Sequence, residues 1–274
     1  MYRNYIFDFY GTLADIRTDE ESPLLWKKMS EIYSALGASY ESEELRQAFR
    51  RLEEAQKEKI GLEDARKEES GLKEIRKEKP GLEDARKEKL RLQDAEPDLT
   101  KVFAHLYEEK NIPCGAGQAR MTAITFRALS RKFLRAYDGA EELLKELRRR
   151  GKGIYLLSNA QTDFTRPEIE MLGLTGYFDG IFISSEQGCR KPSPRFFERL
   201  LECYGLAPSE SIMIGNDKSA DIAGACHVGM DSLYIHTDIS PKEYLCEETC
   251  PGRRATYYVM DGDFRKIGGL ILRR

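Results

Sequence analysis

The sequence predicts an α/β protein with a parallel central sheet and a block of helices inserted behind its first strand. From Gly139 to the C-terminus, short apolar runs alternate with amphipathic helices, which is the pattern of βαβ units. One further apolar run, at residues 5–7, lies far upstream, and a single strand is not stable alone. We therefore expect this strand to join the later ones, so that the intervening residues form an insertion.

The strands expected in this sheet are short apolar runs at residues 5–7, 154–157, 180–184, 212–214, 232–235 and 255–260. The helices expected between them, from apolar residues at helical spacing, cover residues 139–150, 167–172, 193–204 and 219–227. Strands connected by helices in this way run parallel, with right-handed crossovers. Their carboxyl ends therefore meet at one edge of the sheet, where open α/β sheets bind ligands.

The inserted block, residues 15–133, shows helical patterns and no convincing strand. Its helices are expected at residues 22–37, 41–52, 99–107 and 121–137. Residues 51–95 repeat with a ten-residue period, and at this period each leucine turns roughly 80° from the previous one, so no coiled-coil seam persists. The repeat is interrupted by Gly61, Gly71, Pro80 and Gly81. We interpret it as a solvated, partly frayed helical insertion; the alternative is a partner-binding arm.

Charge and composition exclude several classes of function. The net charge of -3 provides no basic surface for nucleic acid, and no run of about 18 apolar residues would span a membrane. Arg3 and Asp8 interrupt the first residues, which argues against a signal peptide. The six cysteines form no CxxC pair, so we expect reduced thiols rather than a metal site at Cys246 and Cys250. These features indicate a soluble cytoplasmic protein.

Polar residues stand at the ends of several predicted strands, in otherwise apolar surroundings. They are Asp8 after the first strand, Ser158 and Asn159 after the second, Lys191 beyond the third, and Asn216 and Asp217 after the fourth, with Asp221 close behind. Clustered carboxylates with one lysine suit a hard cation such as Mg²⁺, which keeps waters that a phosphate can replace. Taken singly, each residue also has a structural interpretation, as a helix cap or, for Lys191, as a solvated surface residue.

Four segments resemble the motifs of the haloacid dehalogenase (HAD) superfamily, in order and at suitable spacing: Asp8-Phe9-Tyr10-Gly11-Thr12, Ser158-Asn159, Lys191-Pro192 and Gly215-Asn216-Asp217-x-x-x-Asp221. The resemblance implies a Rossmann-like α/β core at residues 1–14 and 135–274. The helices of residues 15–134, with the repeat at about 51–95, resemble the helical type 1 cap of subfamily I. A phosphatase-like hydrolase acting on a small phosphorylated metabolite is implied, and no protein partner is indicated.

The resemblance also assigns catalytic roles. Asp8 is expected to be the nucleophile that forms an aspartyl-phosphate. Ser158, with Asn159 beside it, is expected to bind the phosphoryl group that is transferred. Lys191 is expected to offset the charge of Asp8 and the phosphate.

The same resemblance implies a Mg²⁺ site and a phosphate cradle. Asp8, Asp217 and the backbone carbonyl of Tyr10 are the expected ligands of the metal. Asn216 and Asp221 are expected to complete or orient that shell. The backbone N–H groups expected to bind phosphate oxygens are those of Phe9, Gly11 and Thr12.

One position departs from the phosphatases of this family. They usually carry a second aspartate, a general acid and base, two residues after the nucleophile, and Tyr10 stands there. A neutral tyrosine, with a pKa of about 10, is poor in both roles, so phosphatase turnover is expected to fall by roughly 10²–10⁴-fold. The 2-haloacid dehalogenases of the family, which use no metal, also carry tyrosine there. A metal-free dehalogenase-type hydrolase and a weakly catalytic binding or regulatory protein therefore stay open as alternatives.

Overall fold

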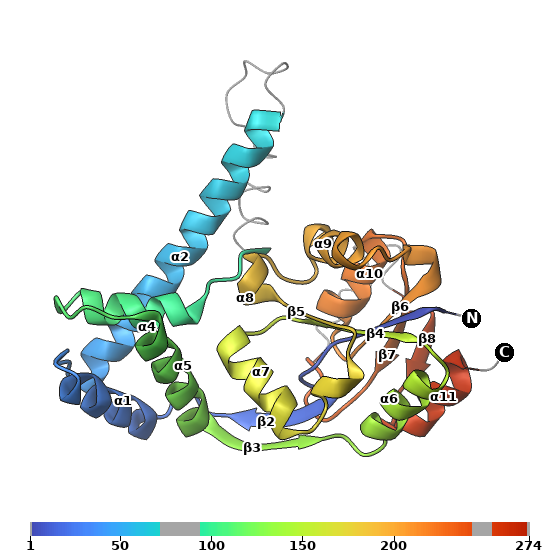
Figure 1. Cartoon of the computed structure of the whole chain (residues 1–274), viewed down its shortest axis with the longest axis horizontal. Helices are drawn as coiled ribbons and strands as arrows, with labels where there is room; N and C mark the ends of the chain where they lie inside the picture. The colour runs from blue at the N-terminus through green and yellow to red at the C-terminus, as the bar shows by residue number, and fades with distance from the viewer. Residues whose placement is uncertain (1, 72–93, 243–253, 273–274) are drawn as a thin grey trace. The chain divides into compact units, whose positions relative to one another are not determined.

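A computed structural model of the chain describes residues 2–71, 94–242 and 254–272 (Figure 1). The chain divides into two compact units. An α/β unit comprises Met1–Thr18 and Lys132–Arg274, and a helical unit comprises Asp19–Arg131. These boundaries lie a few residues inside the predicted insertion of residues 15–134. The repeat residues 72–93 and the pair Cys246 and Cys250 lie outside the described residues.

The α/β unit is built on a six-stranded parallel sheet with the strand order β5-β4-β1-β6-β7-β8. Its strands are β1 (Asn4–Phe7), β4 (Gly153–Ser158), β5 (Gly180–Ile183), β6 (Ser211–Gly215), β7 (Asp231–Ile235) and β8 (Tyr257–Val259). The strand β1 lies between β4 and β6, so the carboxyl ends of these three neighbours meet at one edge. The predicted α/β fold with a parallel sheet is confirmed.

Helices cover both faces of this sheet (Figure 1). They are α6 (Ala140–Arg149), α7 (Thr162–Met171), α8 (Ser184–Gln187), α9 (Pro194–Tyr204), α10 (Ala223–His227) and α11 (Phe264–Ile271), with a π-helix at Lys218–Ile222 and 3₁₀ turns at Thr175–Tyr177 and Pro208–Glu210. Local sequence signals explain several of the helix ends. Helix α9, for example, starts at Pro194 and ends at Tyr204, and the Gly205 that follows has the left-handed conformation.

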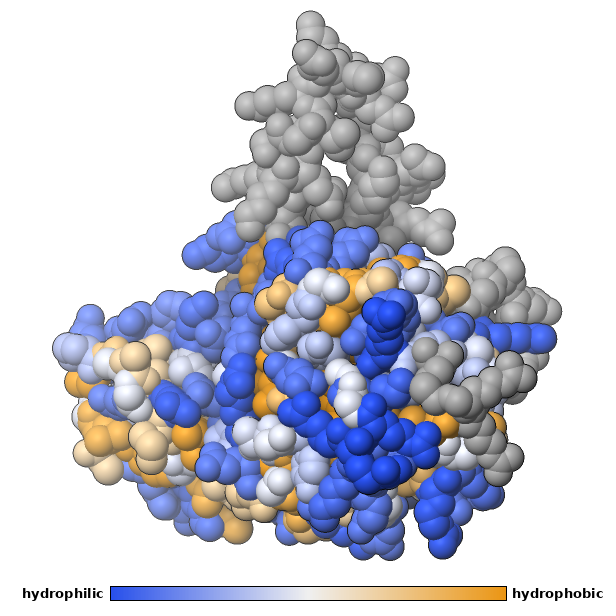
Figure 2. All heavy atoms as spheres, turned by 45° about the vertical axis from the view of Figure 1, so that its right-hand side comes forward, coloured by the Kyte–Doolittle hydropathy of each residue, from blue (hydrophilic) through white to orange (hydrophobic). Residues whose placement is uncertain are grey.

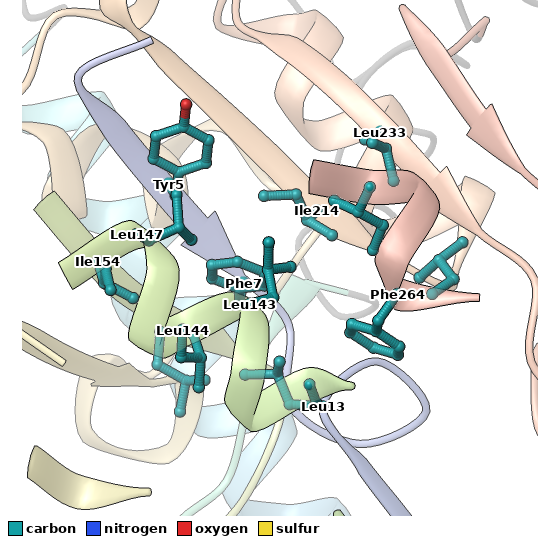
Figure 3. Close-up of a cluster of buried hydrophobic side chains, with 14 of the residues drawn as sticks. Tyr5, Phe7, Leu13, Leu143, Leu144, Leu147, Ile154, Ile214, Leu233 and Phe264 are labelled. Carbon is teal, nitrogen blue, oxygen red and sulfur yellow. The ribbon is translucent and has the colours of Figure 1, made fainter. Parts of the chain in front are cut away.

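The strand β1 sends alternate side chains into two apolar clusters, one on each face of the sheet. Tyr5 and Phe7 pack in the cluster that includes the leucines of α6 and Phe264 of α11, as Figure 3 shows. Ile6 packs on the other face with Phe196 and Phe197 of α9. A strand covered on both faces must be apolar throughout, which explains the unbroken run of residues 5–7. The first charged side chain after it, Asp8, therefore lies where the sheet ends.

The helical unit consists of α1 (Pro23–Ala35), α2 (Ser42–Gly71), α4 (Leu99–Glu108) and α5 (Ala116–Ser130). Its core is a group of aromatic rings from all four helices, with centroids 5.3–5.7 Å apart: Trp26, Phe49, Phe103 and Phe126. The backbone enters and leaves the unit at neighbouring points, because the N–H of Asp19 donates to the carbonyl oxygen of Ser130 at 2.8 Å.

Two predictions for the inserted block are wrong. Helix α2 continues through Gly61, because one glycine in a helix costs only about 1 kcal/mol. The helix predicted at residues 121–137 ends at Ser130, and β3 (Arg131–Ala136) follows and pairs with β2 (Ala14–Thr18). These two strands lack a simple apolar alternation because their charged residues bind one another: Asp15 is bound by Arg17 and Arg135.

The described surface fits the composition. Figure 2 shows hydrophilic residues over most of the face in view, with hydrophobic residues in scattered groups, as expected for a chain with 33% charged residues. No helix in the described ranges has the length and apolar character needed to cross a bilayer. The cysteines that the structure describes carry thiols: Cys114, Cys189, Cys203 and Cys226.

Candidate active site

Lys191 joins the ends of the central strands in the α/β unit. Its Nζ donates to Asp8 Oδ1 at 2.6 Å, to Asp221 Oδ1 at 2.7 Å and to the carbonyl oxygen of Leu157 at 2.8 Å. An ammonium has three N–H donors, so these three acceptors use all of them. The side chains of Lys191 and Asp221 are each 1% exposed. Lys191 is therefore a buried countercharge for two carboxylates, and the interpretation as a solvated surface lysine is wrong.

Burial and mutual attraction set the charges of this cluster. Burial alone would lower the pKa of Lys191, but the carboxylates of Asp221 and Asp8 raise it, so the group is an ammonium. Burial raises the pKa of Asp221 to about 7; Lys191 opposes this increase and the charge of Asp8 adds to it. When both carboxylates are ionised, two negative charges face one positive charge. The cluster then keeps a negative charge that a metal cation can neutralise.

The turn after β1 is closed by its own backbone. The N–H groups of Leu13 and Ala14 both donate to the carbonyl oxygen of Phe9, at 2.8 and 2.9 Å. The N–H of Gly11 donates to Ala14 O at 2.8 Å and that of Thr12 to Phe9 O at 3.2 Å. The turn therefore uses both groups within itself, so neither N–H is free as expected, and phosphate binding by them stays a prediction.

Gly11 is required in this turn for two reasons. Its φ of +83° lies in the left-handed region, where a side chain is strained. A Cβ atom there would lie 2.2 Å from the side-chain nitrogen of Asn216. The glycine therefore lets the ends of β1 and β6 approach closely.

The two oxygens of Asp8 have different surroundings. Oδ1 accepts from Lys191, whereas Oδ2 has a 3.3 Å contact with the hydroxyl of Thr12, which lies equally far from Asn216 Oδ1. A hydroxyl carries one hydrogen, so it cannot donate fully to both acceptors. Oδ2 is therefore the less engaged oxygen of a buried carboxylate.

Ser158, the last residue of β4, is buried and directly follows Leu157, whose carbonyl oxygen binds Lys191. Within the part of the chain that the structure describes, its hydroxyl has no hydrogen-bond partner. Buried polar atoms are rarely left in this way, so the hydroxyl marks a place where a ligand oxygen fits. The alternative that Ser158 caps the next helix is wrong, because α7 follows Gln161 with no side-chain cap among the described contacts.

Asn159 holds the backbone of Lys191 rather than a helix end. Its Oδ1 accepts from the N–H of Lys191 at 2.8 Å, and its Nδ2 donates to the carbonyl oxygen of Lys191 at 3.0 Å. These two bonds fix the lysine backbone against the loop that follows β4. Asn159 is therefore placed to position Lys191.

The two acidic residues after β6 differ in orientation. Asp217 Oδ1 accepts from the N–H groups of Ser219 and Ala220, at 2.7 and 3.0 Å, and so caps the π-helix. Asp221 turns back toward the sheet, where its Oδ2 accepts from the N–H of Asp217 at 2.9 Å. Gly215 makes room for it, since a Cβ atom there would lie 2.1 Å from Asp221 Oδ2.

The donors near Asp8 suit Mg²⁺ rather than a softer metal. Asp8, Asn216 and Asp217 offer oxygen ligands at the ends of the paired strands β1 and β6. Across the described residues, no three side chains of histidine, cysteine, aspartate or glutamate are grouped to hold one ion. Mg²⁺ commonly takes one or two protein carboxylates and fills its shell with water and phosphate oxygens. The residues present therefore fit this ion, with Asp8 as an anionic ligand.

The side chain of Tyr10 is directed at helix α7. Its hydroxyl donates to Glu168 Oε2 at 2.5 Å and lies 3.0 Å from Thr165 Oγ1. Thr165 and Glu168 are both buried, at 0% and 1% exposure. Sequence reasoning missed these partners because it started the helix at residue 167. A helix from Thr162 places Thr165 and Glu168 on the same buried face as Ile169. Two polar residues on an apolar helix face are the sequence signal that could have predicted a buried polar contact.

Known proteins resemble this chain in sequence and in fold. The family model described as haloacid dehalogenase-like hydrolase matches residues 2–229. Phosphoserine phosphatase from Thermus thermophilus is 33% identical over 172 residues, which cover 62% of this chain and 64% of that protein. Ribulose-1,5-bisphosphate 5-phosphatase from Halopiger xanaduensis is 38% identical over 131 residues, which cover 48% of this chain and 53% of that protein. The chain thus spans between about half and 64% of the length of these relatives.

A solved structure covers the fold more completely. The 2-haloacid dehalogenase from Pseudomonas syringae aligns with a TM-score of 0.60 over 100% of this chain and 99% of that one. The two sequences are 17% identical, so this likeness shows the fold alone.

Proposed function

Because this chain belongs to the haloacid dehalogenase-like hydrolases, we propose that it is a phosphatase of small phosphorylated compounds that uses Asp8 as its nucleophile. The observation that carries the proposal is the asymmetry of Asp8, whose Oδ1 is held by Lys191 while Oδ2 keeps a long contact. The relatives named as phosphatases support a phosphoryl group as the target.

In the proposed reaction, Asp8 Oδ2 attacks phosphorus as the bond from phosphorus to the leaving oxygen breaks, which forms an aspartyl-phosphate. Lys191 offsets the charge of Asp8, and Asn159 and Asp221 position this lysine. The hydroxyl of Ser158, which has no hydrogen-bond partner among the described residues, donates to a phosphate oxygen, as does the N–H of Phe9. Water then cleaves the aspartyl-phosphate, releasing phosphate and the free carboxylate.

Mg²⁺ is the proposed cofactor. Asp8, the backbone carbonyl of Tyr10, and the side chain of Asn216 or Asp217 would hold it, and all of these are oxygen donors. When bound, it supplies positive charge for the phosphate oxygens. Asp221 is proposed to act beside this shell, because its carboxylate already binds Lys191.

The helical unit is proposed to act as a cap. In such an arrangement, an inserted helical unit selects the substrate and excludes water from the reacting group. The proposed localisation is cytoplasmic, and the proposed substrates are small phosphorylated metabolites.

Hydrolysis of p-nitrophenyl phosphate tests the proposed function. We expect phosphate release that requires Mg²⁺, is abolished by EDTA and returns when excess Mg²⁺ is added. Halide release from 2-chloropropionate, measured in parallel, tests the dehalogenase alternative that Tyr10 suggests. Halide release that persists in EDTA, without phosphatase activity, would establish that alternative. If folded protein performs neither reaction, the binding or regulatory alternative takes precedence.

A further inference from the structure

When a phosphate ester is cleaved, the bond from phosphorus to oxygen breaks and the electron pair stays on the departing oxygen. An alkoxide is a strong base, so its departure is slow unless an acid gives it a proton as it leaves. A carboxylate or a nitrophenolate is stable and can leave without one. The proton donors beside Asp8 therefore limit which phosphorylated compounds the site can cleave.

The ammonium of Lys191 has no hydrogen left for a leaving group. Its three N–H donors are taken by Asp8, Asp221 and the carbonyl oxygen of Leu157, at 2.6–2.8 Å. Moving the lysine to a leaving group would leave two buried carboxylates without their countercharge. Lys191 can offset charge on the phosphoryl group but cannot act as the acid.

The phenol of Tyr10 has given its single hydrogen to Glu168, at 2.5 Å. Because that hydrogen is used, the hydroxyl of Thr165, 3.0 Å away, is the donor in the second contact. The ring of Tyr10 also packs edge-on against the buried ring of Phe9, with centroids 4.8 Å apart. Contacts at both the ring and the hydroxyl therefore hold this side chain with its hydrogen directed at α7.

Two further hydroxyl groups among the described residues lie at this end of the sheet: that of Thr12, 3.3 Å from Asp8 Oδ2, and that of Ser158, the last residue of β4. Both are aliphatic alcohols, so neither is more acidic than the alcohol that an alkyl ester would release. They can donate hydrogen bonds to phosphate oxygens, but they provide no driving force for protonating an alkoxide. Asp221 has both of its oxygens engaged as acceptors, Oδ1 by Lys191 and Oδ2 by the N–H of Asp217. None of these side chains is thus placed to act as a general acid.

We propose that the substrates of this site are phosphorylated compounds with acidic leaving groups, with acyl phosphates as the natural class, rather than alkyl phosphate esters. The inference rests on the proposed phosphatase function. Asp8 Oδ2 forms the new bond to phosphorus, and the leaving carboxylate departs with the electron pair and needs no proton. Water then attacks the aspartyl-phosphate, Asp8 leaves as a carboxylate, and the two protons of the water pass to phosphate and solvent.

The test compares aryl and alkyl phosphates of similar shape, so that recognition by the protein changes little. We would measure kcat/KM for p-nitrophenyl, phenyl and benzyl phosphate with the full chain and Mg²⁺, and for acetyl phosphate as the acyl compound. We expect kcat/KM to fall from p-nitrophenyl to phenyl to benzyl phosphate. Benzyl phosphate should lie below p-nitrophenyl phosphate by about 10²-fold or more, the contribution of the missing acid. Acetyl phosphate should be cleaved readily.

Two variants show whether the Tyr10–Glu168 contact causes the expected preference for p-nitrophenyl over benzyl phosphate. Tyr10→Asp introduces a carboxyl group that can serve as an acid, and it should narrow the ratio of p-nitrophenyl to benzyl phosphate by at least about tenfold. Glu168→Gln keeps an acceptor for the Tyr10 hydroxyl but cannot feed it a proton, so the ratio should stay within a few-fold of the wild-type value. The ratio does not depend on the fraction of protein that is folded, so a destabilised variant remains informative.

Each result decides between the inference and an alternative. Similar rates for the three esters would overturn the inference and leave the phosphatase function standing. A ratio that Glu168→Gln widens by tenfold or more would also overturn it, because Glu168 would then be passing protons through Tyr10. If none of the four compounds is cleaved, acetyl phosphate included, the proposed function itself fails.

Discussion

Asp8 and Asp15 are two buried carboxylates in one short segment, and their partners differ. Asp15 is 0% exposed, and both of its oxygens accept from guanidinium groups. Its Oδ1 accepts from Arg17 at 2.5 Å, and its Oδ2 from Nε and Nη2 of Arg135 at 3.0 and 2.9 Å. Asp8 is 7% exposed and has one oxygen held by Lys191 and another at 3.3 Å from a hydroxyl.

The difference indicates that burial alone does not mark a reactive carboxylate. Charge-assisted bonds to both oxygens stabilise the anion of Asp15 and cover the atoms that would attack a substrate. At Asp8 a single ammonium binds Oδ1, whereas the electron pairs of Oδ2 stay available. We therefore expect Asp15 to serve the fold and Asp8 to serve the reaction.

Exchanging each carboxylate for its amide separates these two roles and gives the largest expected effect. Asp8→Asn should lower hydrolysis of p-nitrophenyl phosphate by about 10³-fold or more, because an amide oxygen is a poor nucleophile. Asp15→Asn should keep activity within a few-fold and lower the free energy of unfolding by about 1–3 kcal/mol, because one amide cannot accept from both arginines. The measurements are steady-state kinetics and urea denaturation.

The two variants act as controls for each other. Asp8→Asn must unfold at a urea concentration close to that of the wild-type protein for its loss of activity to be chemical. If Asp15→Asn is inactive at temperatures where it is fully folded, the division between a structural and a reactive carboxylate is wrong.

Removing the cation from each carboxylate should give the next largest effect. Lys191→Met leaves Asp8 and Asp221 facing one another in the interior, and it should cost about 3–5 kcal/mol of unfolding free energy. Arg135→Met is the matched change at Asp15, and it should cost about 1 kcal/mol or less, because that side chain is 70% exposed and Arg17 remains. Urea denaturation of both variants measures the difference. Equal costs would mean that exposure of the cation does not decide its contribution.

A third carboxylate, Glu146 on α6, shows whether two arginine partners stabilise the fold when the carboxylate is not buried. Replacing it should give the smallest effect on stability. It accepts from Arg149 and Arg150, as Asp15 does from two arginines, but it is at the surface. These bonds lower its pKa to about 2. A lowered pKa stabilises the fold above the ordinary value of 4.5, and this contribution is lost as the pH falls toward about 2.

We therefore expect Glu146→Gln to lower the melting temperature slightly at pH 7, where salt and solvent screen the ion pairs. The difference from the wild-type protein should shrink as the pH falls below 4.5. Thermal unfolding at several pH values, in low and high salt, measures it. A difference that grows on acidification would contradict the assigned direction of the pKa shift.

The positions of Asp8, Ser158 and Asn216 were predictable because the strands before them are buried on both faces. In such strands the first polar residue marks the edge of the sheet, and the topology brings these edges together. The motifs also indicated the family, and the match of the family model to residues 2–229 confirms that resemblance.

Other features depended on contacts that no local pattern carries. The strands β2 and β3 carry no alternation of apolar and polar residues that would predict them. They contain Asp15, Arg17 and Arg135, which form ion pairs with one another. The different orientations of the Asp217 and Asp221 carboxylates follow from the π-helix and from the space beside Gly215. Both are properties of the folded backbone, and the spacing of the two acids alone does not distinguish their roles.

The hydrogen bond between Asp19 and Ser130 has a consequence for how the chain could have acquired its helical unit. Because the helical unit begins and ends at neighbouring points, it connects β2 to β3 as a short hairpin turn would. Closing a loop becomes only slowly more costly with length, by about 0.6 kcal/mol for each doubling. The unit also carries an aromatic core of its own. Such a segment could be exchanged during evolution, or replaced by a designed one, without redesign of the sheet.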